Sequence, residues 1–205
     1  MNGYTTVLKR SYFELEDRKS RFIGEAMPVS NEAEAIAFID SVKKKFPDAT
    51  HHVYAYVLRE NSTARFTDDR EPQGTAGMPV LDSIRKNGIT DVVVVVTRYF
   101  GGTLLGTGGL VRAYSGAALG ALKDAEIAHY DVYATVEIEV SYSDYQKIGL
   151  ILEQFGFRTE GTVYSDKVGI EGSVLADEYA SMLEKLTEAT SGRIKCDKIR
   201  EIFSY

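Results

Sequence analysis

The sequence lacks the features that mark secreted, membrane-spanning and disordered chains. It has one cysteine, Cys196, which cannot form a disulfide within the chain and which suits a reducing compartment. No uninterrupted apolar run approaches the roughly 20 residues that a membrane-spanning helix needs. The start of the chain does not resemble a secretory signal, and low-complexity tracts are absent. We therefore expect a cytoplasmic globular protein that makes no use of a membrane.

The negative charge of the chain is unevenly distributed. The net charge is −6, but residues 1–133 carry 16 Lys and Arg against 17 Asp and Glu, a net of −1. Residues 134–205 carry 8 against 13, a net of −5. Because binding to phosphate depends on the local field, the balanced first part can still bind an anion if its cations share one face.

The last third of the sequence predicts a complete small domain. Apolar and polar residues alternate in the strand 134–141, and apolar residues recur at helical spacing in 144–155 and 177–190. Further strands are predicted at 159–164, 168–175 and 195–203. The resulting order, β-α-β-β-α-β, is that of the ferredoxin-like split motif. We predict a second domain over residues 134–205.

The first part predicts a sheet with helices, so the expected fold class is α+β. Expected strands are 5–8, 12–16, 20–29, 52–59, 64–67 and 91–97, and expected helices are 31–46, 80–87 and 108–128. The strand Asp91–Thr97 contains five consecutive valines, which indicates burial on both faces in the middle of a sheet. We predict that this first domain covers residues 1–133.

Five glycines lie in nine residues between the valine strand and the following helix. They are Gly101, Gly102, Gly106, Gly108 and Gly109. The average frequency of glycine is about 7%, so this cluster requires a geometric reason. Glycine permits positive φ, and it lets another backbone or a phosphate approach closely. The stretch also leads into a helix N-terminus, where free N–H groups favour anions.

Cations and aromatic rings flank these glycines. Arg98 precedes them and Arg112 follows in the helix, so both guanidinium groups could bind one anion, while Tyr99 and Phe100 offer stacking surfaces. Neither a Walker loop nor a dinucleotide fingerprint is present. The further candidates for anion or nucleic-acid binding are Lys19, Arg21 and His52. The alternative is a packing turn whose arginines pair with internal carboxylates.

A second loop, Thr67–Pro79, is rich in carboxylates. Its candidate residues are Asp68, Asp69, Arg70 and Glu71, and His51 and His52 precede it on a strand. Such groups could act as general acids and bases or bind a hard cation. However, their spacing matches no metal motif, and the carboxylates could instead cap the next helix and pair with Arg98 and Arg112. We assign no catalytic residue, metal or cofactor.

These loops resemble the IMPACT family, also called the YigZ or UPF0029 family. The resemblance covers most of residues 18–120 and rests on Ser20–Ile23, His51–Tyr56, Asp68–Pro79 and Val94–Tyr114. It implies an N-terminal domain like domain 2 of ribosomal protein S5 and a ferredoxin-like C-terminal domain, a pair similar to two domains of elongation factor G. The family pattern has glycine where this chain has Arg70, so we predict that position 70 does not need positive φ here.

The resemblance also directs the functional prediction. Eukaryotic relatives restrain the amino-acid-starvation kinase pathway by competing for its ribosome-associated activator, although they carry a different second domain. We predict a translation-associated regulator that binds RNA or a ribosome-associated partner through the glycine- and arginine-rich stretch. The alternatives are an enzyme acting on a phosphate-bearing small molecule and a protein–protein adaptor.

Overall fold

Residues 3–205 are described by a computed structural model, which confirms the predicted α+β class. The described chain has five α-helices and two antiparallel sheets. It divides into two units, residues 4–129 and residues 130–205 together with Gly3, which we call the N-terminal and C-terminal units. In the described part of the chain, no helix combines the length and the hydropathy needed to cross a membrane.

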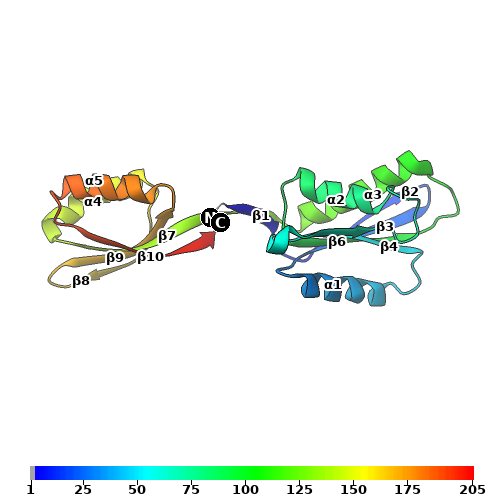
Figure 1. The fold of residues 1–205 in the computed structure, drawn as a ribbon, viewed down its shortest axis with the longest axis horizontal. Helices are drawn as coiled ribbons and strands as arrows, with labels where there is room; N and C mark the ends of the chain where they lie inside the picture. Colours follow the sequence, from blue (N-terminus) through cyan, green and yellow to red (C-terminus); the bar gives the residue numbers. More distant parts are fainter. Residues whose placement is uncertain (1–2) are drawn as a thin grey trace. The chain divides into compact units, whose positions relative to one another are not determined.

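The N-terminal unit is built on an antiparallel five-stranded sheet with β6 (Val92–Tyr99) at its centre (Figure 1). The order across the sheet is β2 (Phe13–Asp17), β3 (Ser20–Pro28), β6, β4 (His51–Val57) and β5 (Ala64–Thr67). The short β1 (Tyr4–Val7) lies outside it, and its Thr5 forms an isolated bridge with Ile89. A 3₁₀ turn at Glu60–Ser62 connects β4 to β5.

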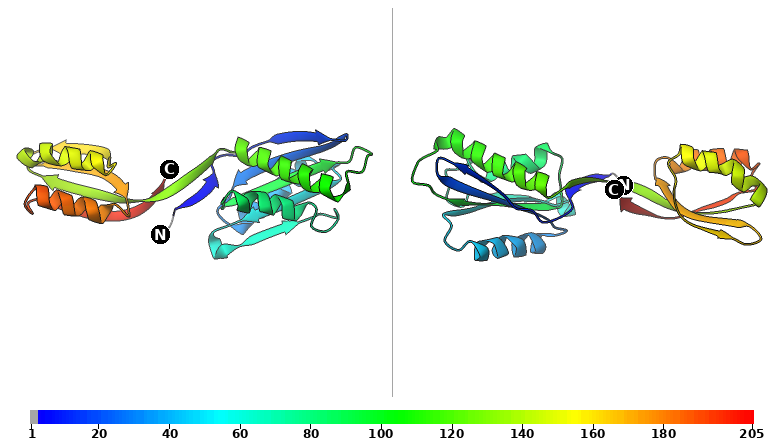
Figure 2. Two further views of the ribbon diagram at one scale, coloured as in Figure 1. Left: turned by 90° about the horizontal axis from the view of Figure 1, so that it is seen from above. Right: turned by 180° about the vertical axis from the view of Figure 1, so that it is seen from behind.

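Helices cover both faces of this sheet. α2 (Gly77–Lys86) and α3 (Gly106–Asp124) lie side by side on one face, and α1 (Glu32–Lys45) lies on the other (Figures 1 and 2). The valines of β6 alternate between two hydrophobic clusters, with Val94 in the cluster under α2 and α3 and Val93 in the cluster under α1. All five valines are fully buried. The prediction of a strand buried on both faces is therefore confirmed.

Small residues allow α3 to pack very close to the sheet. A Cβ atom added to Gly24 of β3 would lie 2.4 Å from the backbone oxygen of Ala117 and 3.2 Å from the Cβ of Ala121. No side chain larger than hydrogen fits at position 24 with the helix in this place. The small residues that the sequence places along this helix thus hold its backbone against β3.

The C-terminal unit has the predicted β-α-β-β-α-β order. Its elements are β7 (Ile127–Val140), α4 (Tyr142–Gln154), β8 (Arg158–Tyr164), β9 (Val168–Leu175), α5 (Tyr179–Ala189) and β10 (Lys195–Ser204). β7 lies between β9 and β10, and β8 lies on the outer side of β9. α4 and α5 pack against one face of this sheet (Figures 1 and 2), where Ile148 and Leu186 are fully buried. Cys196 packs at the edge of the same core.

Some helices begin or end at other residues than predicted, because a cap or the local backbone conformation determines the first or last turn. The predicted helix 108–128 begins earlier, at Gly106, and ends earlier, at Asp124. It ends there because Glu126 adopts a left-handed conformation with φ of +59°. Glycine is the usual residue in this conformation after a helix, so the glutamate gave no sequence signal for the helix end. α4 begins at Tyr142, earlier than the predicted 144, because the side chain of Ser141 caps it by accepting from the Asp144 amide.

Candidate functional site

The glycine-rich stretch forms the loop between β6 and α3. Gly102 and Gly106 have φ of +81° and +72°, a region in which other residues are strained. Gly101 meets a different requirement, because an added Cβ would lie 2.0 Å from the carbonyl carbon of Lys19. The loop therefore packs directly on the turn between β2 and β3. These three glycines are explained by the path of the backbone within the protein.

The remaining two glycines lie in the first turn of α3. Gly109 packs against Leu105, since an added Cβ would lie 2.8 Å from the Cβ of Leu105. Gly108 is exposed, and the only neighbour of an added Cβ would be the Arg112 side chain at 3.8 Å. The N-cap residue Leu105 provides no side-chain cap, and no side chain of residues 3–205 accepts a hydrogen bond from the first amides of this helix. The first N–H groups of α3 are therefore open to solvent or to an anion.

Arg98 lies in the interior and not on this open surface. Its residue is 5% exposed, and its Nη1 atom donates to Glu71 Oε1 at 2.5 Å. The buried Tyr114 hydroxyl donates to the same oxygen at 2.7 Å. Burial, together with the negative charge of Glu71, raises the pKa of Tyr114 far above its ordinary value, so the hydroxyl stays a donor. Glu71 thus links the acidic loop to Arg98 of β6 and to Tyr114 of α3. For Arg98, this is the alternative in which the arginine pairs with an internal carboxylate.

The two histidines on β4 also have partners within the protein. His51 Nδ1 lies 2.7 Å from the backbone oxygen of Asp69, and its Nε2 lies 3.7 Å from Glu71 Oε1. His52 Nε2 lies 3.0 Å from the backbone oxygen of Phe46, and burial lowers the pKa of the His52 ring. The Asp69 carboxylate accepts from the His52 backbone amide at 2.6 Å. His52 is thus a half-buried, neutral side chain at pH 7.

Asp68 closes the amino end of α2. Its carboxylate accepts from the backbone amides of Gly74, Ala76 and Gly77 at 2.8–3.1 Å. This is the capping alternative for the acidic loop, and it explains why α2 starts at Gly77 instead of the predicted Val80. Within residues 3–205, no three His, Cys, Asp or Glu side chains are grouped so that they could hold a metal ion.

The prediction for position 70 is wrong. Arg70 has φ of +70°, and the preceding Asp69 has φ of +42°. The turn therefore uses the left-handed conformation for which glycine, the residue of the family pattern, is suited. The Arg70 side chain is 82% exposed and lies 4.0 Å from Asp69, so it adds a cation to the surface of the acidic loop.

The other predicted cations are on the surface around the glycine loop. Arg21 forms an ion pair with Glu14, which lowers the pKa of Glu14 to about 2, and its guanidinium lies 5.8 Å from the Tyr99 ring centroid. Lys19 lies at the tip of the β2–β3 turn, and Arg112 is exposed on α3. Neither Lys19 nor Arg112 forms an ion pair within the described chain.

One cation of this surface was missed by the sequence analysis. The Arg18 guanidinium donates to the backbone oxygen of Leu104 at 3.1 Å, and it joins the β2–β3 turn to the glycine loop. Nothing in the local sequence places Arg18 near residue 104, because the contact depends on the pairing of β3 with β6. Leu104 itself is 79% exposed and Phe100 is 46% exposed. We call Arg18, Lys19, Phe100, Leu104 and Arg112 the glycine-loop surface.

Known proteins resemble this chain over both units. The family model described as the Impact N-terminal domain matches residues 18–122, and a domain of unknown function (DUF1949) matches residues 138–193. The protein "IMPACT family member YvyE" of Bacillus subtilis is 37% identical over 194 residues, which cover 94% of this chain and 89% of that protein. "IMPACT family member YigZ" of Escherichia coli is 33% identical over 91% of this chain and 93% of its own length.

A solved structure agrees with these sequence matches. It is titled "Crystal structure of an hypothetical protein", and it superposes on 98% of this chain and 98% of its own length with a TM-score of 0.61 at 30% identity. Similarity of this extent in sequence and structure, over nearly the whole length of the relatives, is not produced by a shared fold alone. The chain belongs to the IMPACT family.

Proposed function

We propose that the N-terminal unit binds RNA through the glycine-loop surface and that it serves a regulatory role in translation. The observation that carries this proposal is the open amino end of α3, beside which Arg112 is exposed and has no carboxylate partner in the described chain. Helix amides together with an unpaired guanidinium are donors suited to a phosphate group. The link to translation rests on the family resemblance.

The contrast with α2 supports an external ligand at α3. The amides at the start of α2 are occupied by the Asp68 carboxylate of the same chain. Those at the start of α3 have no such partner among the described residues, and the turn carrying Arg18 and Lys19 is held beside them by the hydrogen bond from Arg18 to Leu104. The turn with Arg18 and Lys19 and the helix with Arg112 are far apart in the sequence, and they lie side by side at the amino end of α3.

Exposed apolar side chains favour single-stranded RNA over a free phosphate ion. Phe100 is 46% exposed and Leu104 is 79% exposed, on the loop that enters α3. A ring next to phosphate-binding groups can stack on an unpaired base, which contributes about 1–3 kcal/mol per base. The enzyme alternative receives less support, because Asp68, Asp69 and Glu71 each accept hydrogen bonds within the protein.

The proposal is tested by measuring RNA binding as a function of salt. A labelled single-stranded RNA of about 12 nucleotides is titrated with the full chain between about 50 and 200 mM salt, and binding is followed by fluorescence anisotropy. We expect the double variant Lys19→Glu with Arg112→Glu to bind at least about tenfold more weakly. The slope of log K against log salt should become less negative by about 1.4, because each phosphate contact on a single strand contributes about −0.7 to this slope and two contacts are removed.

A matched control separates this surface from charge in general. Lys86→Glu with Lys123→Glu changes the net charge by the same amount at the carboxyl ends of α2 and α3, away from the glycine loop. Its affinity should stay within about twofold of the unmodified protein. Equal weakening in both double variants, or no binding of the unmodified protein at about 50 mM salt, contradicts the proposal.

A further inference from the structure

The C-terminal unit has a sheet with one free face. Alternate residues of β7, such as Val136 and Ile138, point into the core beneath α4 and α5. The residues between them, Glu137 and Glu139, are exposed on the other face. No helix of residues 130–205 covers that face (Figures 1 and 2).

Strand register places three carboxylates in one row across this outward face. Asp197 of β10 pairs with Glu137 of β7, and Glu137 pairs with Glu171 of β9. Adjacent strands are about 4.8 Å apart, so these like charges are direct neighbours, an arrangement that destabilises a sheet. A cation placed over the row would remove this cost.

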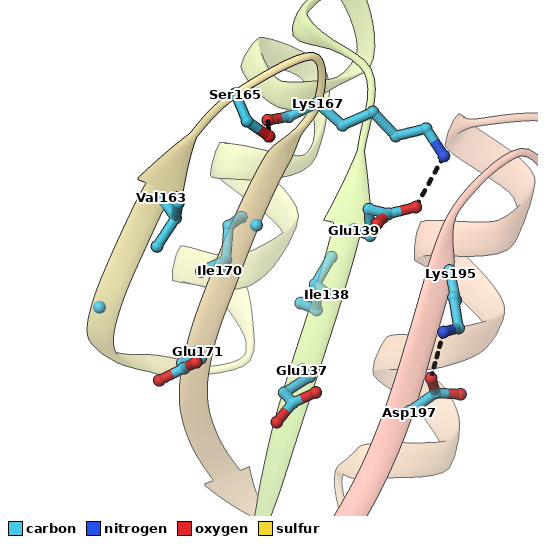
Figure 3. A pocket seen from close by; sticks show the side chains of 12 residues that line it. Glu137, Ile138, Glu139, Val163, Ser165, Lys167, Ile170, Glu171, Lys195 and Asp197 are labelled. Atoms are coloured by element: carbon cyan, nitrogen blue, oxygen red, sulfur yellow. Dashed lines mark hydrogen bonds and ion pairs between the residues drawn. The ribbon is translucent and has the colours of Figure 1, made fainter.

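Both lysines that line this part of the face are engaged with other carboxylates. Lys167 contacts Glu139 at 2.7 Å, and Lys195 contacts Asp197 at 3.3 Å. Figure 3 shows both contacts as dashed lines, with Glu137 and Glu171 on neighbouring strands away from either lysine. No ion pair or hydrogen bond joins the Glu137 or Glu171 side chain to any residue between 3 and 205. Two adjacent carboxylates therefore lack a cation.

A hollow beside this pair gives access to it. Gly161 of β8, opposite Glu171, and Gly169 of β9 leave the outward side of their strands bare, and the exposed Val163 lies directly opposite Gly169. The hollow has a volume of about 280 Å³. That is slightly less than the roughly 300–1,000 Å³ of sites for small molecules, so it suits a single side chain of a larger partner.

Charge restricts the chemistry of that partner. Residues 130–205 contain 14 Asp and Glu against 8 Lys and Arg, a net of −6, which repels phosphate backbones. The described residues contain no grouping suited to a metal ion. An arginine or lysine side chain fits both features, because its charged end can bind Glu137 and Glu171 while its apolar stem lies along Val163.

We propose that the outward face of the C-terminal sheet docks an arginine- or lysine-bearing segment of a partner protein, whose cationic side chain enters the hollow beside Glu137 and Glu171. This site is separate from the glycine-loop surface and does not depend on RNA binding. The two units would then contact ligands of opposite charge.

The test measures binding of a basic peptide to the full chain. The probe is a fluorescein-labelled peptide with arginine at alternate positions, which places the guanidinium groups on one side of an extended chain. We expect binding that weakens with salt and that is at least about tenfold weaker in the double variant Glu137→Gln with Glu171→Gln. A peptide with glutamine in place of arginine should not bind.

A control variant removes the same charge from the opposite side of the unit. Glu184→Gln with Glu188→Gln changes two exposed residues of α5, and affinity should stay within about twofold. Equal weakening in both variants overturns the proposal, as does equal binding of the glutamine peptide. A third result also overturns the proposal: the arginine peptide does not bind, and sedimentation shows self-association that is abolished by Glu137→Gln with Glu171→Gln and not by the control variant. In that case a second copy of the chain would occupy the face.

Discussion

The two units differ in whether the carboxylates of their sheets are paired with cations of the same chain. In the N-terminal unit, helices cover both faces, and the buried carboxylates are neutralised internally, Glu71 by Arg98 and Glu25 by Arg10 and Lys45. In the C-terminal unit one face has no helix, and Glu137 and Glu171 lie opposite each other there without a cationic partner among residues 3–205. A covered face forces charges to pair within the chain, because an unpaired buried charge is costly. An open face tolerates unpaired charges and leaves them available to a partner.

The largest effect is expected from breaking the buried pair of the N-terminal unit. Arg98→Met leaves Glu71 buried without its cation, so the free energy of unfolding should fall by about 3–5 kcal/mol. The matched variant Arg112→Met removes an exposed guanidinium of the same stretch and should change stability by no more than about 0.5 kcal/mol.

Both variants can be compared by chemical denaturation followed by circular dichroism, since the chain has no tryptophan. Similar small losses in the two variants would show that Arg98 is not an internal anchor, and the distinction between paired and open charges in this unit would fail.

An intermediate effect separates glycines that the fold requires from those that it does not. Gly101→Ala places a Cβ against the Lys19 backbone, so the turn or the loop must shift, at about 1–3 kcal/mol. Gly108→Ala meets only the flexible Arg112 side chain, and it should stabilise α3 by about 0.5–1 kcal/mol because alanine favours a helix. Thermal unfolding of both variants measures the difference, and a stabilised Gly101→Ala protein would show that the close contact is not needed.

The smallest effect concerns the open face of the C-terminal unit. Glu137→Gln with Glu171→Gln removes repulsion between directly opposed residues and should raise stability by about 0.2–1 kcal/mol. Glu184→Gln with Glu188→Gln, on α5, should have a smaller effect, since these residues are not paired across strands. A loss of stability in the first variant would mean that the two carboxylates already have a stabilising partner in the protein.

Most helices and strands were predictable because their signals are local. The five valines of β6 indicate a central strand without any knowledge of its neighbours, and the predicted helix 31–46 corresponds to α1, which Asn31 caps by accepting from the Glu34 amide. Helix ends set by groups outside the helix were less predictable, and capping of α2 by the acidic loop was only one of the alternatives that the sequence allowed. α2 begins earlier than its pattern predicts because the Asp68 carboxylate, separated from it by a loop, accepts from its first amides.

The candidate site was predictable in part, since residue types are visible in a sequence and their exposure is not. Arg98 and Arg112 have similar local contexts in the glycine-rich stretch, yet one is buried against Glu71 and the other is exposed. Arg18 joins the surface only through its contact with Leu104. The carboxylate row of the C-terminal unit was not visible at all, because it depends on the register of β7 with β9 and β10.

The sequence by itself determined the α+β class, the order of elements and the family, because periodicity, turn residues and motifs act through neighbours along the chain. Tertiary structure alone decided which charges are neutralised and which remain free. That outcome depends on which strands pair, in which register, and which faces the helices cover, and those contacts join residues that are far apart in the sequence.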